Sequence, residues 1–467
     1  MALGVTVDTS VISVLKEYYG VQDVEALVFR GSPVLGRLKK KRVGGKYVPL
    51  PVAAYGNGAV TADYTQVSTQ APNSYIGLAF QLVPGQLFAS FVLDPKEFLA
   101  SEPDRGAFIE VFAIRAMFAL DDLRKTLATC LYNTGYLEMG VIRAVDTTNY
   151  LYVDVDPSTA MALTPASSSG GGSQILFALT PTSAYRSANS IQIASIANQQ
   201  NTGYTRITFQ TSFVTTTSVG DYILLKGGRD AAGNPNAPVG LAAWIPSTGF
   251  RASTSTAWTT QISTPFYNVN RSVAPDRLAG QFVQRNAAAG ETYTAALLRL
   301  LKTIRRAGGD SDLIVVNDDD YAVIMNDALA NRTFYSNVVA GDAPREAGYQ
   351  QGISQFQMIF STSWINKVVD DPYCPKGLAY ILSTETIGLY TISNAEKILD
   401  KLPLDNEPGA PRADSEATPT KMIGFLWDDM YTTSEVPLQS GMGIRVDYNF
   451  YGNFGISAPA HNGVCVF

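Results

Sequence analysis

The chain has 467 residues, of which 46% are hydrophobic and only 16% charged, with a formal net charge of −6. This length allows several units with cores of their own, and the low share of charged residues indicates that much of the surface meets other protein. The acidic balance excludes a chain whose whole surface binds nucleic acid and leaves room only for a local basic patch.

The N-terminal part contains two short helical segments, residues 10–19 and 21–29, each followed by a glycine or proline stop. Residues 46–93 are rich in Gly, Pro, Thr and Tyr, with alternating apolar positions. This pattern predicts strands in a long projecting loop or hairpin. Loops of this length usually serve to contact another molecule.

Residues 106–135 carry the strongest helical pattern in the chain. Apolar side chains fall within one arc at 100° per residue, and Asp121 has ion-pair spacing to Arg124 and Lys125. One continuous helix of about 26 residues, a rod about 40 Å long, accounts for this pattern. Phe118 and other apolar residues on the polar side predict that the first half of the helix is covered from both directions.

Residues 141–265 change to short β-prone runs with loose Gly-, Ser- and Asn-rich connections. These runs predict antiparallel strands of an inserted β-rich region, and residues 220–246 predict a strand, a wide turn and a second strand. An amphipathic helix is expected at 294–309, then a buried strand and a second helix, and residues 421–467 are strand-like. The absence of a fixed repeat in the sequence excludes solenoids and propellers.

The three cysteines, Cys130, Cys374 and Cys465, are odd in number and have no CxxC spacing. This disfavours a disulfide framework or a zinc site and is typical of a reducing compartment. No stretch reaches the roughly 18 to 20 uninterrupted apolar residues of a membrane span. We therefore expect a protein kept in a cytoplasm-like space, with no membrane partner.

Three consecutive carboxylates, Asp318 to Asp320, follow an apolar strand and could bind a divalent cation. Alternatively, Asn317 or Asp318 caps the next helix, and the other carboxylates favour its positive N-terminus. Capping is preferred, because no second acidic or histidine cluster is spaced to complete a metal site. Neither a metal nor a cofactor is expected.

The stretch VVDDPYCPKG, residues 368–377, combines the paired carboxylates Asp370 and Asp371 with the thiol of Cys374. The sole histidine, His461, has no GxSxG elbow in the chain to accompany it, so nucleophilic catalysis is not expected. The prolines and the glycine predict a turn that aims a following strand. No enzymatic activity is expected from these residues.

A dense basic run is the candidate interaction site. Such a run neutralises nucleic-acid phosphates or serves as a nuclear-import signal. It can equally be a solvated strand, or an arm that meets the acidic face of a neighbouring subunit, and these alternatives stay open. The residues of the site are Arg37, Lys39, Lys40, Lys41, Arg42 and Lys46.

Several blocks together resemble tailed-phage major capsid proteins with the HK97-like fold. Residues 15–58 are similar to the stretch that leads into the projecting loop of that family, and residues 106–135 resemble its spine helix. Further blocks follow in the same order, and the resemblance covers most of the chain apart from residues 141–220. Those blocks are residues 238–246, 266–280, 303–324 and 370–382.

The resemblance implies an α+β fold of the HK97-like class. With the β-rich insertion added, the expected division is an N-terminal arm at 1–45, an extended loop at 46–93, a peripheral domain with the spine helix at 94–140, the insertion at 141–265, a return to the peripheral domain at 266–291, an axial domain at 292–420, and C-terminal strands of both domains at 421–467.

The function implied is a shell protein, not an enzyme, that self-assembles into hexamers and pentamers of an icosahedral phage head around double-stranded DNA. Implied partners are other copies of the chain, packaged DNA through non-specific contacts, and portal, scaffolding and decoration proteins. The implied location is the virion, after assembly in the host bacterial cytoplasm. Two alternatives stay open: a β-rich hydrolase that uses the paired Asp residues, and a bacterial nanocompartment shell of the same fold.

Overall fold

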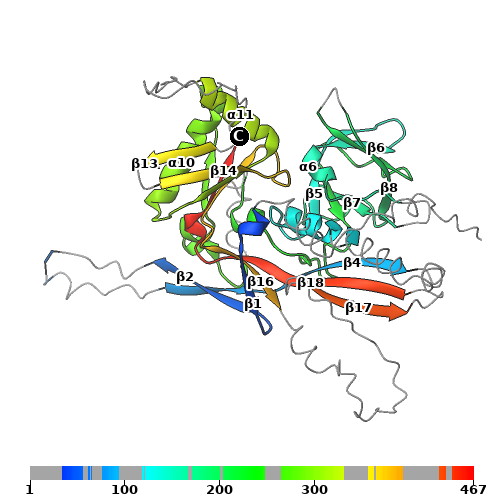
Figure 1. Ribbon diagram of the computed structural model, residues 1–467, viewed down its shortest axis with the longest axis horizontal. Helices are drawn as coiled ribbons and strands as arrows, with labels where there is room; N and C mark the ends of the chain where they lie inside the picture. Colours follow the sequence, from blue (N-terminus) through cyan, green and yellow to red (C-terminus); the bar gives the residue numbers. More distant parts are fainter. Residues whose placement is uncertain are drawn as a thin grey trace, which may run out of the picture.

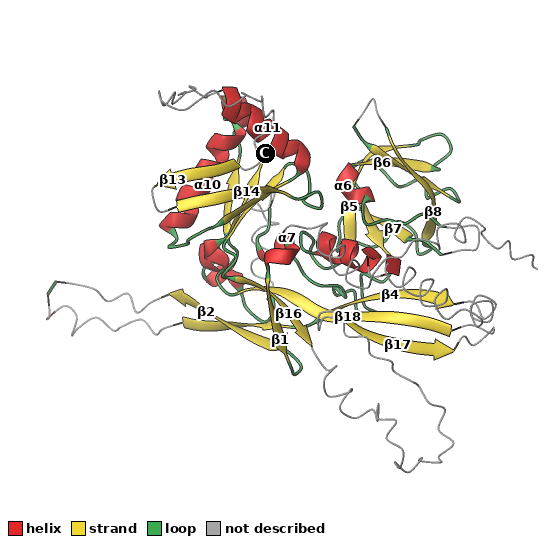
Figure 2. Cartoon of the chain, viewed as in Figure 1, coloured by secondary structure: helices red, strands yellow, loops and turns green. Residues whose placement is uncertain are grey.

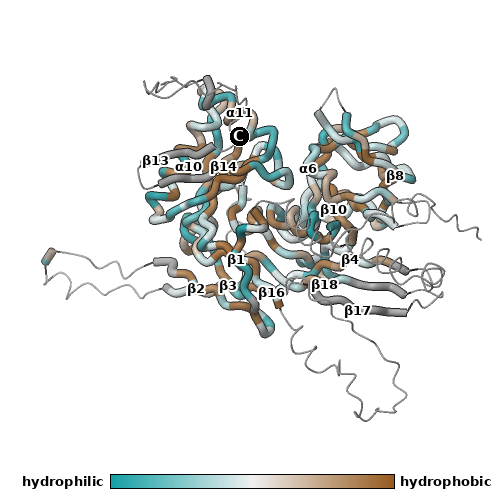
Figure 3. The backbone as a smooth tube through the Cα atoms, viewed as in Figure 1, coloured by the Kyte–Doolittle hydropathy of each residue, from teal (hydrophilic) through white to brown (hydrophobic). Residues whose placement is uncertain are grey.

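The computed structural model shows an α+β chain with a projecting hairpin, a five-stranded sheet, a closed β-barrel, and a six-stranded sheet with helices (Figure 1). Hydrophobic residues gather mainly inside the body (Figure 3). The predicted helices before residue 34 lie outside the described residues. The structure describes residues 34–55, 62–63, 65, 76–93, 118–119, 121–166, 171–199, 203–247, 265–330, 356–361, 364–392, 431–437 and 444–467.

The long strand β18 (Ile444–Ile456) organises the five-stranded sheet. On one side β4 (Gly85–Leu93) pairs with it, and on the other side β17 (Tyr431–Pro437) and then β16 (Ile387–Ile392) pair along its length. β1 (Lys39–Val43) follows the short helix η1 (Leu35–Arg37) and adds to β16 in parallel. Among the described strands, β1 therefore forms an edge of this sheet.

The strands β2 (Val48–Tyr55) and β3 (Ile76–Leu82) form the predicted hairpin, which projects from the body on the left of Figure 2. Its root is fixed by Leu50, Phe80 and Leu82, which are all buried in the main core. Phe80 packs edge-on against the ring of Trp244, with ring centroids 5.0 Å apart. The root of the hairpin is thus anchored to the body by its own apolar side chains, and Val52 and Leu78 also pack against the main core.

Six short strands close into an antiparallel barrel, which confirms the predicted antiparallel strands of this region. Its interior contains the edge-to-face rings of Phe177, Phe209 and Phe213, with centroids 5.5 to 5.8 Å apart. The elements are β5 (Glu138–Val145), β6 (Tyr152–Val155), α6 (Pro157–Ala160), β7 (Gln174–Ala178), β8 (Ile191–Asn198), β9 (Thr205–Phe209) and β10 (Tyr222–Leu225).

The six-stranded sheet divides its side chains between two cores. Ile314 and Val316 face α10 and α11, while Leu313 and Val315 face the main core, because side chains alternate along a strand. The sheet order is β11 (Gln281–Gln284), β19 (Gly463–Val466), β15 (Leu378–Leu382), β12 (Leu313–Val316), β14 (Trp364–Asp370) and β13 (Phe356–Ser361), and the helices are α10 (Tyr293–Arg306) and α11 (Asp318–Ala330).

Strands from different expected domains pair within the same sheet. β11, within 266–291, joins the six-stranded sheet through β19, whereas β16, within 292–420, joins the five-stranded sheet. β4, within 46–93, belongs to the five-stranded sheet and not to the projecting hairpin. The division into named domains stays a prediction.

The second strand predicted within residues 220–246 is wrong, because the chain forms the short helix α7 (Leu241–Trp244) there. Leu241 and Trp244, three positions apart, share a helix face and are both buried. The indole nitrogen of Trp244 donates to Phe454 O at 3.0 Å, a contact from the main core. The remaining short helices are η3 (Arg271–Val273), α9 (Pro275–Leu278), η4 (Ala287–Ala289) and η5 (Pro459–His461).

The helix that ends at Cys130 is described only from residue 118 onward, so the first part of the long helix lies outside the described residues. The predicted pairs are present: Asp121 contacts both Arg124 and Lys125 at 2.6 Å. Phe118 is 61% exposed in the single chain, contrary to the expected covering. Among the helices that the structure describes, none is both long and apolar enough to cross a membrane.

Candidate functional site

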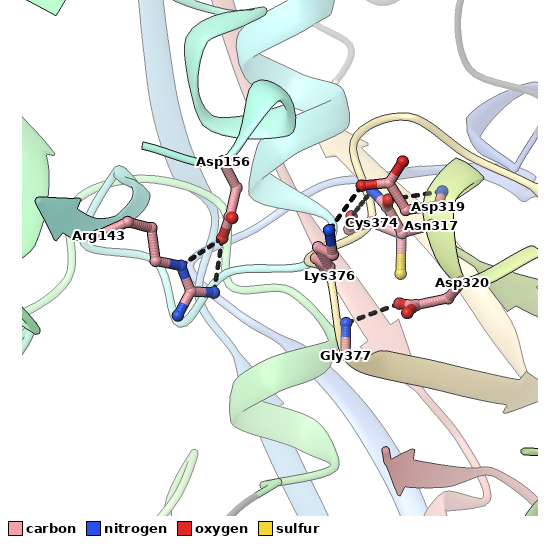
Figure 4. Close-up of polar contacts among 8 residues, drawn as sticks. All are labelled: Arg143, Asp156, Asn317, Asp319, Asp320, Cys374, Lys376 and Gly377. Carbon is pink, nitrogen blue, oxygen red and sulfur yellow. Dashed lines mark hydrogen bonds and ion pairs between the residues drawn. The ribbon is translucent and has the colours of Figure 1, made fainter. Parts of the chain in front are cut away.

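The three carboxylates Asp318 to Asp320 open helix α11 directly after strand β12. Asn317 caps this helix, because its Oδ1 accepts a hydrogen bond from the backbone amide of Asp319 at 3.1 Å. Its Nδ2 donates to Cys374 O at 2.7 Å, which ties the cap to the turn at residues 371–377 (Figure 4). The predicted capping role of Asn317 is confirmed.

Asp319 and Asp320 bind the same turn from the side of α11 (Figure 4). Lys376 Nζ lies 2.8 Å from Asp319 Oδ2, and the backbone amide of Gly377 donates to Asp320 Oδ2 at 2.6 Å. Burial raises the pKa of Asp320, while the Gly377 amide and the Lys376 cation oppose this rise. Both carboxylates are therefore engaged in holding the turn.

Asp371 is fully buried and joins the turn to the segment that follows the long helix. Its Oδ2 accepts a hydrogen bond from the hydroxyl of Tyr132 at 2.8 Å, and its Oδ1 accepts one from the backbone amide of Tyr373 at 3.0 Å. The predicted turn is confirmed, and Gly377 supplies its left-handed position with a φ of 83°. Sequence reasoning missed Tyr132, since nothing in the local pattern marks a residue that far away in the chain.

Cys374 is buried beside this carboxylate, with its Sγ 3.6 Å from Leu378 O. Burial, followed by the charges of Asp371, Asp320 and Asp318, raises the pKa of the thiol well above its usual value. Because the thiolate is the reactive form, this thiol is a poor nucleophile in the folded chain.

The carboxylates do not converge on one site. The part of the chain that the structure describes contains no group of three or more His, Cys, Asp or Glu residues placed to hold a metal ion. Asp318 and Asp370 come nearest to a carboxylate pair: burial raises the pKa of Asp318, and the charges of Asp370 and Asp319 raise it further. The cluster is a structural joint between the six-stranded sheet and its neighbours.

A second ion pair faces this turn from the barrel (Figure 4). Arg143 donates to Asp156 Oδ2 through Nε at 2.8 Å and through Nη2 at 2.6 Å. A hydrogen bond to Asp319 raises the pKa of Lys376. The negative charge of Asp156 raises this pKa further, by a smaller amount. Sequence reasoning missed Arg143 and Asp156, because only the barrel register brings these residues opposite each other.

The basic run forms the edge strand β1 and its flanking turns. Arg37, Lys39, Lys40, Lys41 and Lys46 are all exposed, and the side chain of Arg42 lies outside the described residues. No salt bridge joins Arg37, Lys39, Lys41 or Lys46 to a carboxylate among the described residues.

Lys41 lies on the same face as Tyr390 of β16. Its Nζ is 3.5 Å from the Tyr390 hydroxyl and 5.4 Å from the ring centroid. The structure thus places the exposed Lys39, Lys40 and Lys41 on strand β1, with the exposed Arg37 and Lys46 in the segments on either side. Lysines on an edge strand also discourage unwanted strand pairing, so their position by itself does not identify a partner.

No protein-family model matches the chain, and no curated protein matches it. A similar solved structure is the capsid asymmetric unit of cyanophage A-1(L), at 13% identity and a TM-score of 0.50, covering 93% of this chain and 92% of that chain. The capsid of an empty GTA particle aligns at 8% identity and a TM-score of 0.42, covering 97% and 93%. A structure from Mycobacterium phage Bobi aligns at 9% identity and a TM-score of 0.41, covering 99% and 98%. The shared architecture extends over nearly the whole chain in the cyanophage match, and the chain therefore has the HK97-like fold of phage capsid proteins.

Proposed function

We propose that the chain is a shell protein that self-assembles into hexamers and pentamers of an icosahedral phage head around double-stranded DNA. The observation that carries this proposal is the alignment with the cyanophage A-1(L) capsid structure over 93% of this chain and 92% of that chain. Portal, scaffolding and decoration proteins are further proposed partners, with assembly in the host bacterial cytoplasm and a final place in the virion.

Exposed aromatic side chains support assembly. Phe88 and Tyr451 are 57% and 37% exposed, and their rings meet edge-on at 5.9 Å on neighbouring strands of the five-stranded sheet. Phe118 is 61% exposed. Single exposed residues are common, but a ring pair that lies open on a sheet gains stability when another subunit covers it.

The hairpin of β2 and β3 supports the same proposal by its shape. It extends away from the body, and its root is tied to the turn at Tyr267, whose carbonyl accepts a hydrogen bond from Gln81 N at 2.9 Å (Figure 1). A hairpin that is firmly held at one end is suited to reach over a neighbouring subunit, and the apolar surface buried there would favour assembly.

The basic strand β1 has two proposed partners. The exposed cations Arg37, Lys39, Lys41 and Lys46 could neutralise phosphates of packaged DNA, a contact that depends strongly on salt. They could equally meet carboxylates of a neighbouring copy, since the chain carries 41 Asp and Glu residues.

Negative-stain electron microscopy and light scattering on the purified full-length chain test the shell proposal. We expect closed particles of uniform diameter, or rings of five and six copies, in some part of a salt and crowding series. Protein that stays monomeric across the whole series would overturn the proposal. Nuclease-protected DNA inside the particles would distinguish a phage head from a nanocompartment with protein cargo.

The hydrolase alternative finds little support in the geometry. Asp319 and Asp320 hold the turn at residues 371–377, and Asp371 accepts hydrogen bonds from Tyr132 and Tyr373. We expect alanine at these three positions to change folding or assembly, whereas a specific loss of hydrolysis in a folded variant would favour the hydrolase.

A further inference from the structure

The turn between the helix ending at Cys130 and the barrel encloses a buried carboxylate. Glu138, the first residue of β5, is only 5% exposed. Its carboxylate accepts hydrogen bonds from the Thr134 amide, 3.1 Å from Oε2 and 3.3 Å from Oε1, and from the Thr134 hydroxyl. Backbone amides of Tyr136 and of Glu138 itself also favour the charged form. Groups of the turn therefore bind the carboxylate of Glu138, the residue at which the turn ends.

The backbone of this turn adopts unfavourable φ values, and hydrogen bonds from other segments of the chain hold it in that conformation. Gly135 has a φ of 98° and Leu137 a φ of 55°, and the left-handed region is costly for a residue with a side chain such as Leu137. The backbone amide of Ala237 donates to Gly135 O at 3.1 Å, and that of Leu225 donates to Leu137 O at 3.1 Å. Because the turn stores strain, modest changes in its hydrogen bonds shift how easily it opens.

Among the described residues, the titratable groups on which the charge of Glu138 acts are a thiol and two phenols. Cys130 lies in the helix, Tyr136 in the turn and Tyr222 in β10, and the charge of Glu138 contributes to the raised pKa of each of these groups. The cation of this region, Arg229, lies over the rings of Tyr136 and Tyr185, 5.7 and 4.3 Å from their centroids.

Arg229 also donates a hydrogen bond to Pro181 O. The charge of the next residue, Asp230, helps to raise the pKa of Tyr136. Arg229 therefore contacts rings and a backbone carbonyl, and the largest influences on the pKa of Glu138 are burial, which raises it, and hydrogen bonds, which lower it. A buried ionised carboxylate is a costly group, and the cost falls when it binds a proton.

We propose that this turn is a proton-sensitive hinge, in which protonation of Glu138 tightens the joint between the helix and the barrel and ionisation loosens it. Burial raises the pKa of Glu138 above its usual value of 4.5, and the hydrogen bonds from Thr134 only partly oppose this. The stabilisation is fully present below pH 4.5 and is lost as the pH rises through the raised pKa. The hinge is a property of the single chain and does not depend on the shell function.

Hydrogen exchange of the full-length chain, measured by mass spectrometry at pH 7.5 and pH 5.5, tests this hinge. After correction for intrinsic exchange rates, we expect peptides that cover residues 131–141 to gain protection at the lower pH, by up to about tenfold for each unit by which the pKa of Glu138 is raised. In Glu138→Gln, which is neutral at both pH values, protection should be equal at both. An unchanged response in Glu138→Gln, or no response in the wild type, would overturn the hinge.

A second variant keeps the test decisive if Glu138→Gln does not fold. Thr134→Val removes the hydroxyl donor that favours the charged form, so the midpoint of the pH response should move to higher pH. A midpoint that stays in place or falls contradicts the proposal. Glu385→Gln serves as the matched control, because Glu385 is an exposed glutamate and its replacement should leave the response as in the wild type.

Discussion

The side-chain amide of Asn453 donates a hydrogen bond to the phenolic oxygen of Tyr267 at 2.7 Å, and the contact lies at the root of the projecting hairpin. The same nitrogen donates to Val83 O at 2.6 Å, between β3 and β4. The side-chain Oδ1 of Asn453 accepts a hydrogen bond from the backbone amide of Val239 at 2.7 Å. One side chain of β18 therefore joins three segments that are far apart in the sequence.

Asn453→Ala should destabilise the folded chain by about 2 to 4 kcal/mol, because several buried donors and acceptors lose their partner at once. Asn453 is only 2% exposed, so water cannot easily replace the lost contacts. The free energy of unfolding from urea denaturation measures this loss. Asn189→Ala, at an exposed asparagine of the barrel, is the control and should change stability by less than about 0.5 kcal/mol. Equal stability of the two variants would contradict the role assigned to Asn453.

Two neighbouring tyrosines should respond differently to loss of their hydroxyl. Tyr132 and Tyr380 are both buried with ring centroids 5.8 Å apart, but only Tyr132 donates to a carboxylate, that of Asp371. The Tyr380 hydroxyl has no hydrogen-bond partner among the described residues.

Tyr132→Phe should therefore cost about 1 to 3 kcal/mol, because a buried carboxylate loses a donor. Tyr380→Phe should be neutral or slightly stabilising, because it removes an unpaired polar group. Thermal and urea unfolding of the two variants check this difference. A larger loss in Tyr380→Phe would show that the hydrogen bond to Asp371 contributes little.

The stability of the chain should fall above about pH 9. Burial raises the pKa of Cys465 to about 12, and burial and nearby carboxylates raise that of Cys374 well above its usual 9.0. Burial also raises the pKa of Tyr448 to about 12. These groups stay protonated in the folded chain but ionise in the unfolded chain, so stability is lost as the pH rises above 9 for the thiols and 10 for the phenol, by up to about 1.4 kcal/mol per pH unit and group.

The melting temperature between pH 7.5 and pH 10.5 measures this effect. Cys374→Ala should reduce the slope, and a thiol reagent at pH 8 should label the three cysteines only after unfolding, since all three are buried. Rapid labelling of Cys374 in the folded chain would contradict the raised pKa and the burial of its thiol.

Replacing Lys39, Lys40 and Lys41 with Gln should lower stability by less than about 1 kcal/mol, because these side chains are exposed and Lys41 loses its contact with Tyr390, but should weaken their contacts in an assembly. Particle yield and nuclease-protected DNA per particle separate the two proposed partners. A severalfold loss of protected DNA at constant yield identifies phosphate contacts, and a loss of yield identifies a neighbouring subunit.

The matched control is Lys226→Gln with Lys302→Gln, two exposed lysines away from β1, which should change neither quantity. If the triple variant equals this control in both measurements, strand β1 is only a solvated edge.

Local elements were predictable because the residues that form them are close together in the chain. Thr292 caps α10 and Asn317 caps α11, each through a hydrogen bond to an amide within three residues. The turn after Asp371 follows from its prolines and Gly377, and Asp121 pairs with Arg124 at a distance set by helix geometry. Capping and turn chemistry depend on the few residues involved, so no tertiary contact is needed to infer them.

The residues of the candidate site were predictable from the sequence, but their distant partners were not. Composition marked the basic run and the carboxylates, and the structure places Lys39 and Lys41 at a sheet edge and Asp319 and Asp320 against a turn. The partner of Asp371 was not predictable, since Tyr132 lies 239 positions away. A side chain that is satisfied by a distant residue leaves no signal in its own neighbourhood.

The sequence by itself determined the helices α10 and α11, the turn at residues 371–377 and the β-prone runs of the barrel, and the order of blocks that resembles phage capsid proteins. Only the tertiary structure decided that β16 pairs with β1 and β18, that β19 lies between β11 and β15, that six strands close into a barrel, and that the segment ending at Trp244 is helical. Local preferences act over a few residues, whereas strand pairing is selected by the burial of side chains brought together from the whole chain.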